Sequence, residues 1–173
     1  MGEVELTLEN PGSFTLALRV PGWAQGRPLP SGLYRYVDDN SHAVTLRVNG
    51  AVVDYDLEQG FARLTRNWSA GDFVALTLPM PVQRVVSSED VVENRNKVAV
   101  QRGPLVFCAE EIDNGAHLAE QVFDAGSRLE AVFEPDLLGG TVMVRGELTL
   151  IPYYAWSHRG GEMAVWLRRD PVE

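Results

Sequence analysis

Short runs in which apolar and polar residues alternate recur along the chain. In residues 4–8, 14–20 and 44–48, every second residue is apolar. Because successive side chains of a strand point to opposite faces, this period of two predicts strands with one buried face. The strands that we predict span residues 3–8, 14–20, 44–48, 51–54, 61–66, 73–78, 82–86, 98–100, 105–109, 129–133, 141–144, 148–151 and 163–167.

Turn-forming residues separate these runs. The cluster Asn-Pro-Gly-Ser at residues 10–13 predicts a hairpin between the first two runs. Asn49-Gly50 predicts a second hairpin, since this dipeptide tolerates the positive φ angles of a tight turn. Gly139-Gly140 can turn the chain between two later runs. Prolines at 79 and 81 interrupt strand pairing, because proline has no backbone N–H to donate.

A polar stretch at residues 87–97 replaces the alternation and is the best candidate for a domain boundary. Short strands separated by Gly, Pro and Asn are typical of sandwiches rather than of alternating β-α units. We therefore predict an all-β fold of two small antiparallel β-sandwich lobes, residues 1–90 and 91–173, of jelly-roll or immunoglobulin-like type. Little helix is expected, and only residues 116–123 could hold a turn or two.

Charge and hydropathy exclude several partners. The chain of 173 residues has a formal net charge of -9 with only 15 Lys and Arg, which argues against nucleic acid as a partner. No apolar run approaches the roughly 20 residues of a membrane helix, so we expect no membrane association. The first residues lack a basic segment followed by an apolar one, which predicts no secretion signal and a cytoplasmic location.

Motifs with tight spacing rules for catalysis or metal binding are missing from the sequence. There is no HExxH, CxxC, GxSxG, GxGxxG or Walker motif, and the three histidines are scattered. The single cysteine, Cys108, lies in the apolar run 105–109 and is interpreted as a small buried hydrophobe. The acidic group Glu110, Glu111 and Asp113 is interpreted as a solvated strand end. We assign no catalytic residue, no metal ligand and no cofactor to this chain.

Aromatic residues give the main hint of a ligand. Exposed aromatic rings on sandwich folds can stack against sugar faces, although many such rings serve as core. The candidate carbohydrate-binding residues are Trp23, Trp68, Tyr154 and Trp156. If residues 153–156 are extended, Tyr154 and Trp156 share one face while Tyr153 takes the other.

Several strings, in order across nearly the whole chain, resemble the C-terminal region of bacterial proteins of glycoside hydrolase family 127, the β-L-arabinofuranosidase-like family. The strings are FTLALRVPGW (14–23), VNG (48–50), WSAGD (68–72), LPMPV (78–82), QRGPLVFC (101–108), IPYYAW (151–156) and GEMAVW (161–166). The resemblance implies β-sandwich domains that follow an (α/α)6 barrel. It also implies that catalysis uses a cysteine nucleophile and a zinc site of cysteines and a glutamate, all in the barrel. Nothing in this sequence matches that cluster.

Two functions follow as hypotheses. The first is a noncatalytic accessory region that packs against the parent's catalytic barrel and contributes to a homodimer; this chain would then not be an enzyme, although its parent would be a glycoside hydrolase. The second is a carbohydrate-binding module that recognises arabinose-containing or other plant polysaccharide glycans. Buried aromatic rings favour the first, and two rings lining an exposed groove favour the second. No motif supports a third function, an independent hydrolase.

Overall fold

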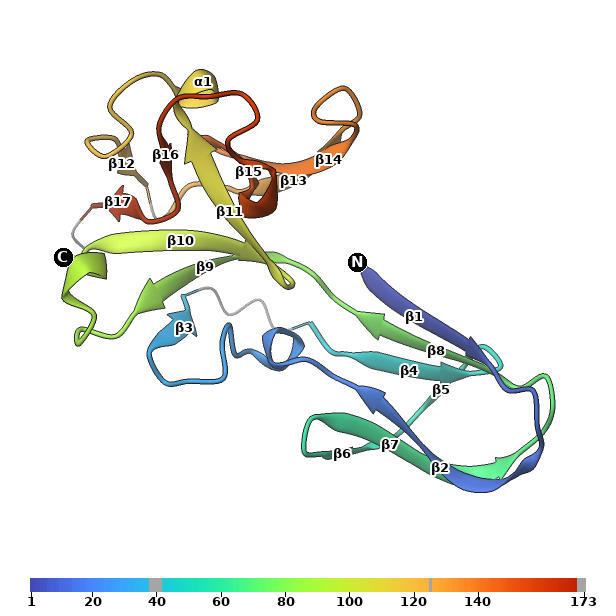
Figure 1. Cartoon of the computed structure of the whole chain (residues 1–173). Helices are drawn as coiled ribbons and strands as arrows, with labels where there is room; N and C mark the ends of the chain where they lie inside the picture. Colours follow the sequence, from blue (N-terminus) through green and yellow to red (C-terminus); the bar gives the residue numbers. More distant parts are fainter. Residues whose placement is uncertain (38–41, 125, 171–173) are drawn as a thin grey trace. The chain divides into compact units, whose positions relative to one another are not determined.

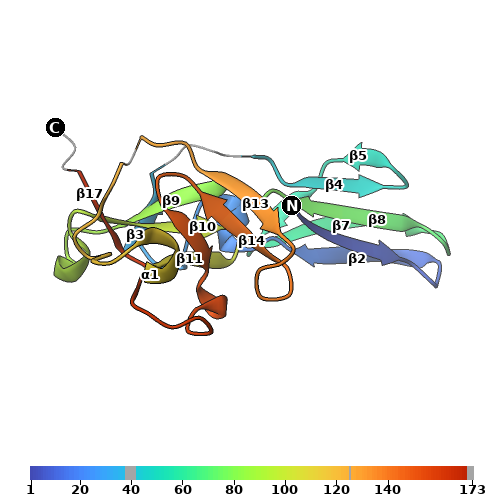
Figure 2. The same ribbon diagram turned by 90° about the horizontal axis from the view of Figure 1, so that it is seen from above.

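The computed structural model describes residues 1–37, 42–124 and 126–170, and strands dominate it (Figures 1 and 2). This confirms the all-β prediction. The strands are β1 (Gly2–Thr7), β2 (Gly12–Arg19), β3 (Tyr34–Tyr36), β4 (Thr45–Val48), β5 (Ala51–Val53), β6 (Asp56–Glu58), β7 (Phe61–Trp68), β8 (Phe73–Leu78), β9 (Val82–Ser87), β10 (Lys97–Arg102), β11 (Leu105–Glu110), β12 (Val122–Phe123), β13 (Glu130–Glu134), β14 (Thr141–Arg145), β15 (Thr149–Pro152), β16 (Met163–Ala164) and β17 (Leu167–Arg169). The helical turns are η1 (Gly22–Gln25), η2 (Val92–Asn94), α1 (Glu111–Asn114) and η3 (Tyr153–Ala155).

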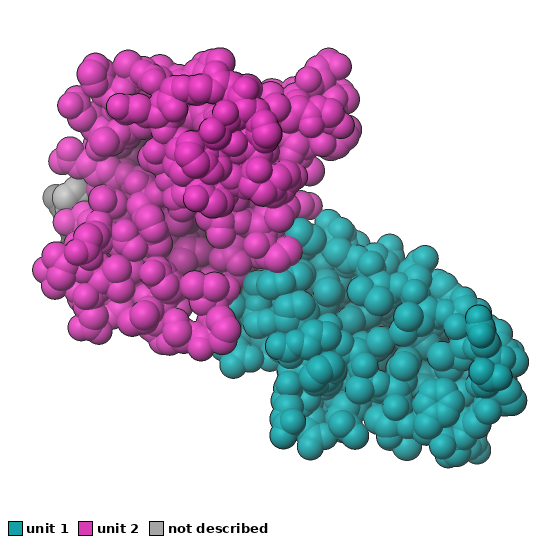
Figure 3. Space-filling model, viewed as in Figure 1, with its two compact units in different colours: residues 1–27, 40–81 teal, residues 28–39, 82–173 magenta. Residues whose placement is uncertain are grey.

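The chain forms two compact units (Figure 3). Unit 1 contains residues 1–27 and 40–81, and unit 2 contains residues 28–39 and 82–173. This division differs from the lobes 1–90 and 91–173 predicted from the sequence. The reason is strand pairing: β9 pairs with β10 on one side and with β3 on the other, so both strands fold with unit 2.

Unit 1 is a sandwich of two antiparallel sheets. Their strand orders are β1-β8-β4-β5 and β2-β7-β6. The alternating residues Val74, Leu76 and Leu78 of β8 are at most 7% exposed, as the period of two predicts. They pack in one core with side chains from both sheets.

The predicted hairpin between the first two runs is wrong. Strand β1 pairs with β8 in one sheet, whereas β2 pairs with β7 in the other. Residues 10–11 therefore lead the chain from one layer of the sandwich to the other, and Pro11 has no N–H with which to continue the ladder. The Asn49-Gly50 hairpin is confirmed, since β4 pairs with β5 and both turn residues have positive φ, 50° and 85°.

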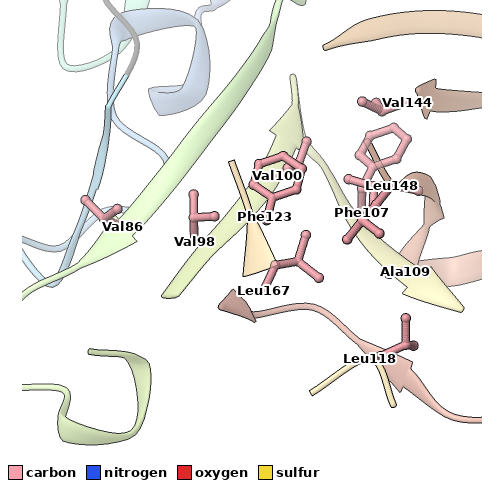
Figure 4. Packing of buried hydrophobic residues seen from close by; sticks show 11 residues of the cluster. Val86, Val98, Val100, Phe107, Ala109, Leu118, Phe123, Val144, Leu148 and Leu167 are labelled. Atoms are coloured by element: carbon pink, nitrogen blue, oxygen red, sulfur yellow. The ribbon is translucent and has the colours of Figure 1, made fainter. Parts of the chain in front are cut away.

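Unit 2 is built on one branched sheet whose main path is β12-β17-β10-β11-β15-β14-β13. Its core holds side chains from seven strands, and Figure 4 shows Phe107, Phe123 and Val144 packed among them. The other face of β11 is also covered, because Cys108 packs with Met143 and Ile151 in a separate cluster. Both faces of the central strands are thus buried.

Three local predictions in unit 2 have clear outcomes. The Gly139-Gly140 turn is confirmed, because it joins β13 to its antiparallel partner β14. The predicted strand 163–167 is divided, since β16 pairs with β11 whereas β17 pairs with β10. The segment 116–123, which could hold a turn or two, forms hydrogen-bonded turns from His117, which has φ 65°, to residue 121 and ends in β12, without a regular helix. The short helix α1 lies before it.

Candidate functional site

Two of the four candidate sugar-binding residues, Trp23 and Trp68, take part in the core packing of unit 1. Trp68 is 3% exposed, and its Nε1 donates a hydrogen bond to the carbonyl oxygen of Phe14 at 3.0 Å. Trp23 is partly buried and packs against the same core. Both rings are therefore engaged in packing within unit 1. Because Trp68 is buried, its ring has no free face for a sugar.

The other two candidates, Tyr154 and Trp156, lie in unit 2 on the segment 153–162, which follows β15. Their residues are 67% and 37% exposed. The segment begins with the 3-10 helix η3 instead of an extended stretch. Because a 3-10 helix has three residues per turn, Tyr153 and not Tyr154 stacks on Trp156, with ring centroids 6.2 Å apart. The condition under which Tyr154 and Trp156 would share one face, an extended segment, is therefore not met.

Tyr154 lines a pocket of about 290 Å³ in unit 2. The other lining residues come from the β13–β14 turn, from the start of β14 and from segment 153–162: Leu138, Gly140, Thr141, Ala155 and His158. The hydroxyl oxygens of Thr141 and Tyr154 are 3.3 Å apart, within hydrogen-bond distance. Within the described ranges of the chain, no Asp, Glu, Lys or Arg is among the lining residues. The pocket thus combines hydroxyl groups and an imidazole with an apolar wall.

Glycine conformations shape the turn side of this pocket. Gly139 and Gly140 have φ of 81° and 99°, which residues with a side chain rarely adopt. A Cβ added at Gly140 would meet the ring of Phe133 at 3.2 Å. The turn is closed by a hydrogen bond from the Gly140 N–H to the carbonyl oxygen of Leu137. Local backbone geometry thus fixes the wall that Leu138 and Gly140 form.

An ion-pair cluster anchors segment 153–162 to β11. Arg159 donates from Nε to Glu110 at 3.0 Å and from a terminal nitrogen to Asp113 at 3.0 Å. The N–H of Ser157 donates to the second carboxylate oxygen of Glu110 at 3.1 Å. The hydrogen bonds with Asp113, and then those with Glu110, raise the pKa of Arg159, although burial opposes this. The cluster holds His158, between Ser157 and Arg159, at the pocket.

Sequence reasoning missed this cluster. Glu110 was expected at a solvated strand end, but it is 2% exposed, so that expectation is wrong. The partner Arg159 lies 49 residues further along the chain. No local spacing could have joined the two residues, because the β11–β16 pairing brings them together.

Cys108 is a poor candidate for a nucleophile, because only the thiolate form of cysteine attacks. It is 1% exposed, as the apolar run around it predicts. Burial, and after it the charge of Glu110, raises the pKa of the thiol to about 12. In the described part of the chain, no group of three or more His, Cys, Asp or Glu residues is arranged to hold a metal ion.

Among the described residues, no helix is long and apolar enough to cross a membrane.

Comparisons with known proteins cover almost the whole chain. Residues 1–80 match the family model described as the β-L-arabinofuranosidase GH127 middle domain, and residues 82–168 match the glycoside hydrolase family 127 C-terminal domain. A curated relative, the non-reducing end β-L-arabinofuranosidase of Bifidobacterium longum subsp. longum, is 35% identical over an alignment 208 positions long that covers 97% of this chain and 29% of the relative.

Solved structures agree with these matches. A GH127 β-arabinofuranosidase is 35% identical, with a TM-score of 0.91 over 98% of this chain and 30% of its own. A GH127 β-L-arabinofuranosidase from Geobacillus stearothermophilus T6 is 36% identical, with a TM-score of 0.82 over 98% of this chain and 29% of its own. The chain therefore spans about 30% of the length of the relatives that it matches.

Proposed function

Because the chain belongs to glycoside hydrolase family 127, we propose that its two units form a noncatalytic accessory region that packs against the catalytic domain of a β-L-arabinofuranosidase-like enzyme. The observation that carries this proposal is the extent of the matches. They assign nearly all of the chain to the middle and C-terminal domains of the family, and these residues correspond to about 30% of the relatives' length. Catalysis then belongs to the remaining part of such a protein.

The side-chain chemistry supports the same assignment. The one cysteine is buried with a raised thiol pKa, so it is protonated at neutral pH and sterically inaccessible. The buried carboxylate of Glu110 is held by Arg159 and by the backbone of Ser157. A carboxylate engaged in this way is poorly placed to donate or accept a proton at a glycosidic bond.

The burial of the tryptophans argues against a sugar-binding role for them in unit 1. Trp68 is in the core and Trp23 packs against it. Of the four candidate sugar-binding residues, only Tyr154 lines the pocket described above. Many modules that bind long glycans line an extended groove with stacking aromatic rings. Such a groove would require at least two of these four side chains to lie together.

A hydrolysis assay tests the noncatalytic assignment. The 173-residue chain is incubated with a nitrophenyl β-L-arabinofuranoside, and nitrophenol release is compared with a buffer blank. The full-length Bifidobacterium longum relative serves as the positive control. We expect release by the chain at the level of the blank, and release above the blank that increases with chain concentration would contradict the proposal.

A reconstitution assay tests packing. The remaining part of the protein that contains this chain is produced separately and mixed with it. We expect the two to co-elute in size-exclusion chromatography, and we expect the midpoint of thermal unfolding of the catalytic part to rise, because a partner that binds only the folded state stabilises it. Separate elution together with an unchanged midpoint would contradict packing.

A further inference from the structure

We propose that the pocket at Tyr154 is a binding site for one neutral sugar ring. This is a second activity of unit 2, and it does not depend on packing against a catalytic domain. The pocket of about 290 Å³ lies just below the roughly 300–1,000 Å³ that is usual for small-molecule sites. That size suits a single pentose or hexose unit rather than a longer chain.

The polar groups of the pocket match the hydroxyl groups of a sugar. Thr141 and Tyr154 place two hydroxyl oxygens 3.3 Å apart, and each can donate and accept a hydrogen bond. Two vicinal hydroxyl groups of a sugar can therefore bond to this pair in either direction. The imidazole of His158 adds a ring nitrogen donor or acceptor at the same pocket.

The apolar groups of the pocket match the C–H face of a sugar. Leu138 and Ala155 supply aliphatic surface, and the ring of Tyr154 belongs to a residue that is 67% exposed. A tyrosine ring buries large apolar area while its hydroxyl stays available for hydrogen bonding. A ligand with hydroxyl groups on one side and C–H groups on the other satisfies both kinds of wall.

The charges around the pocket favour a neutral ligand. Of the residues that the structure describes, no Asp, Glu, Lys or Arg lines it. The guanidinium that follows His158 in the segment, that of Arg159, is engaged by Glu110 and Asp113 and is not free to bind an anion. A carboxylate or phosphate in the pocket would lose water without gaining a partner charge, which is unfavourable. Uronic acids and sugar phosphates are thereby disfavoured.

An NMR titration of the whole 173-residue chain tests this proposal. L-Arabinose and methyl β-L-arabinofuranoside are the probes, and ¹H–¹⁵N spectra locate the binding site. We expect saturable shifts centred on residues 138–141 and 154–158. Galacturonate at the same concentration should cause no such shifts, because it is charged. Saturable shifts confined to other residues, or none at millimolar probe, would overturn the proposal.

Two tyrosines next to each other provide a matched control. Tyr154→Phe removes the hydroxyl that pairs with that of Thr141, another residue of the pocket lining, whereas Tyr153→Phe removes one from a ring that stacks on Trp156. We expect Tyr154→Phe and Thr141→Val each to weaken sugar binding about 2- to 10-fold, as for loss of one hydrogen bond, and Tyr153→Phe to leave it unchanged. The spectra also report whether each variant is folded. Equal affinities of the two Tyr→Phe variants would show that the pocket is not the site.

Discussion

At the residue scale, the buried charge of Glu110 allows a specific prediction about the stability of unit 2. Glu110 is 2% exposed and accepts hydrogen bonds from Arg159 and from the N–H of Ser157. Glu110→Gln removes the negative charge but keeps the size, so Arg159 retains only Asp113 as an ionic partner. Because removing one partner of a buried pair is costly, we expect unit 2 to lose about 2–4 kcal/mol of unfolding free energy, measured by urea denaturation.

A second Glu–Arg pair in unit 2 controls for the change from glutamate to glutamine. Glu134 pairs with Arg145 at 3.1 Å, but both side chains are substantially exposed, at 31% and 52%. Exposed pairs contribute little, so Glu134→Gln should cost less than about 1 kcal/mol. Similar losses for the two variants would mean that burial of Glu110 does not govern the energetics of the cluster.

Cys108 offers a prediction about reactivity and pH. The pKa of the thiol is raised from 9.0 to about 12 in the folded chain, first by burial. We expect iodoacetamide to leave Cys108 unmodified in the folded chain at mildly alkaline pH and to alkylate it fully in urea, as mass spectrometry would show. Rapid alkylation of the folded chain would contradict the burial of this residue.

The raised pKa of Cys108 also determines how the free energy of unfolding changes with pH. Between about pH 9 and pH 12 the folded thiol keeps its proton while the unfolded thiol loses it. Its contribution to stability is therefore complete below pH 9 and is lost as the pH rises toward 12. Cys108→Ala lacks this contribution, so the stability difference between the original chain and this variant should shrink over that window. A difference that stays constant or widens would argue against the shift.

At the element scale, the β4–β5 hairpin isolates the effect of backbone conformation. Gly50 has φ 85°, and a Cβ added there would meet nothing within 4 Å. Gly50→Ala should therefore cost about 1–2 kcal/mol from backbone strain alone. Gly32→Ala is the control, because that position has equally open space without a positive φ. We expect it to be neutral or slightly stabilising in thermal unfolding, and equal effects would exclude strain as the cause.

The elements also show what a sequence can predict in this fold. Strand β8 was predictable because its inner face repeats every two residues, and the β4–β5 turn because Asn49-Gly50 has a strong local preference. The partner of β2 was not predictable, since β7 lies about fifty residues further on and a local turn signal suggested β1. Pairing between distant strands depends on the whole core, which no window of sequence contains.

The residues of the candidate site also differ in whether the sequence alone could identify them. Tyr154 could be selected from the sequence as an aromatic residue whose ring could stack on a sugar. Thr141, its hydroxyl partner, could not, because the two residues meet only when β14 pairs with β15 and segment 153–162 continues from there. Trp68 is the converse case. The sequence offered it as a candidate for sugar binding, but the sandwich buries its ring.

At the scale of the whole molecule, unit 2 depends on a segment inserted in the sequence of unit 1. Strand β3 pairs with β9, the N–H of Ser88 donates to the carbonyl oxygen of Leu33 at 2.7 Å, and Tyr34 stacks on Trp166 with centroids 5.8 Å apart. A chain cut at the boundary of the two family domains, residues 82–173, would lack all of these contacts. The edge of β9 would then be unpaired.

We therefore expect the shortened chain 82–173 to unfold at a lower urea concentration than unit 2 of the whole chain. The amide of Ser88 should be protected from hydrogen exchange in the whole chain and exposed to it in the shortened one, because its acceptor Leu33 is gone. A peptide of residues 28–39 added in trans should restore both properties, and a scrambled peptide should not. If the shortened chain alone keeps the original urea midpoint and Ser88 protection, β3 does not stabilise unit 2. The boundary between the two family domains would then also be the boundary between two independently folding parts.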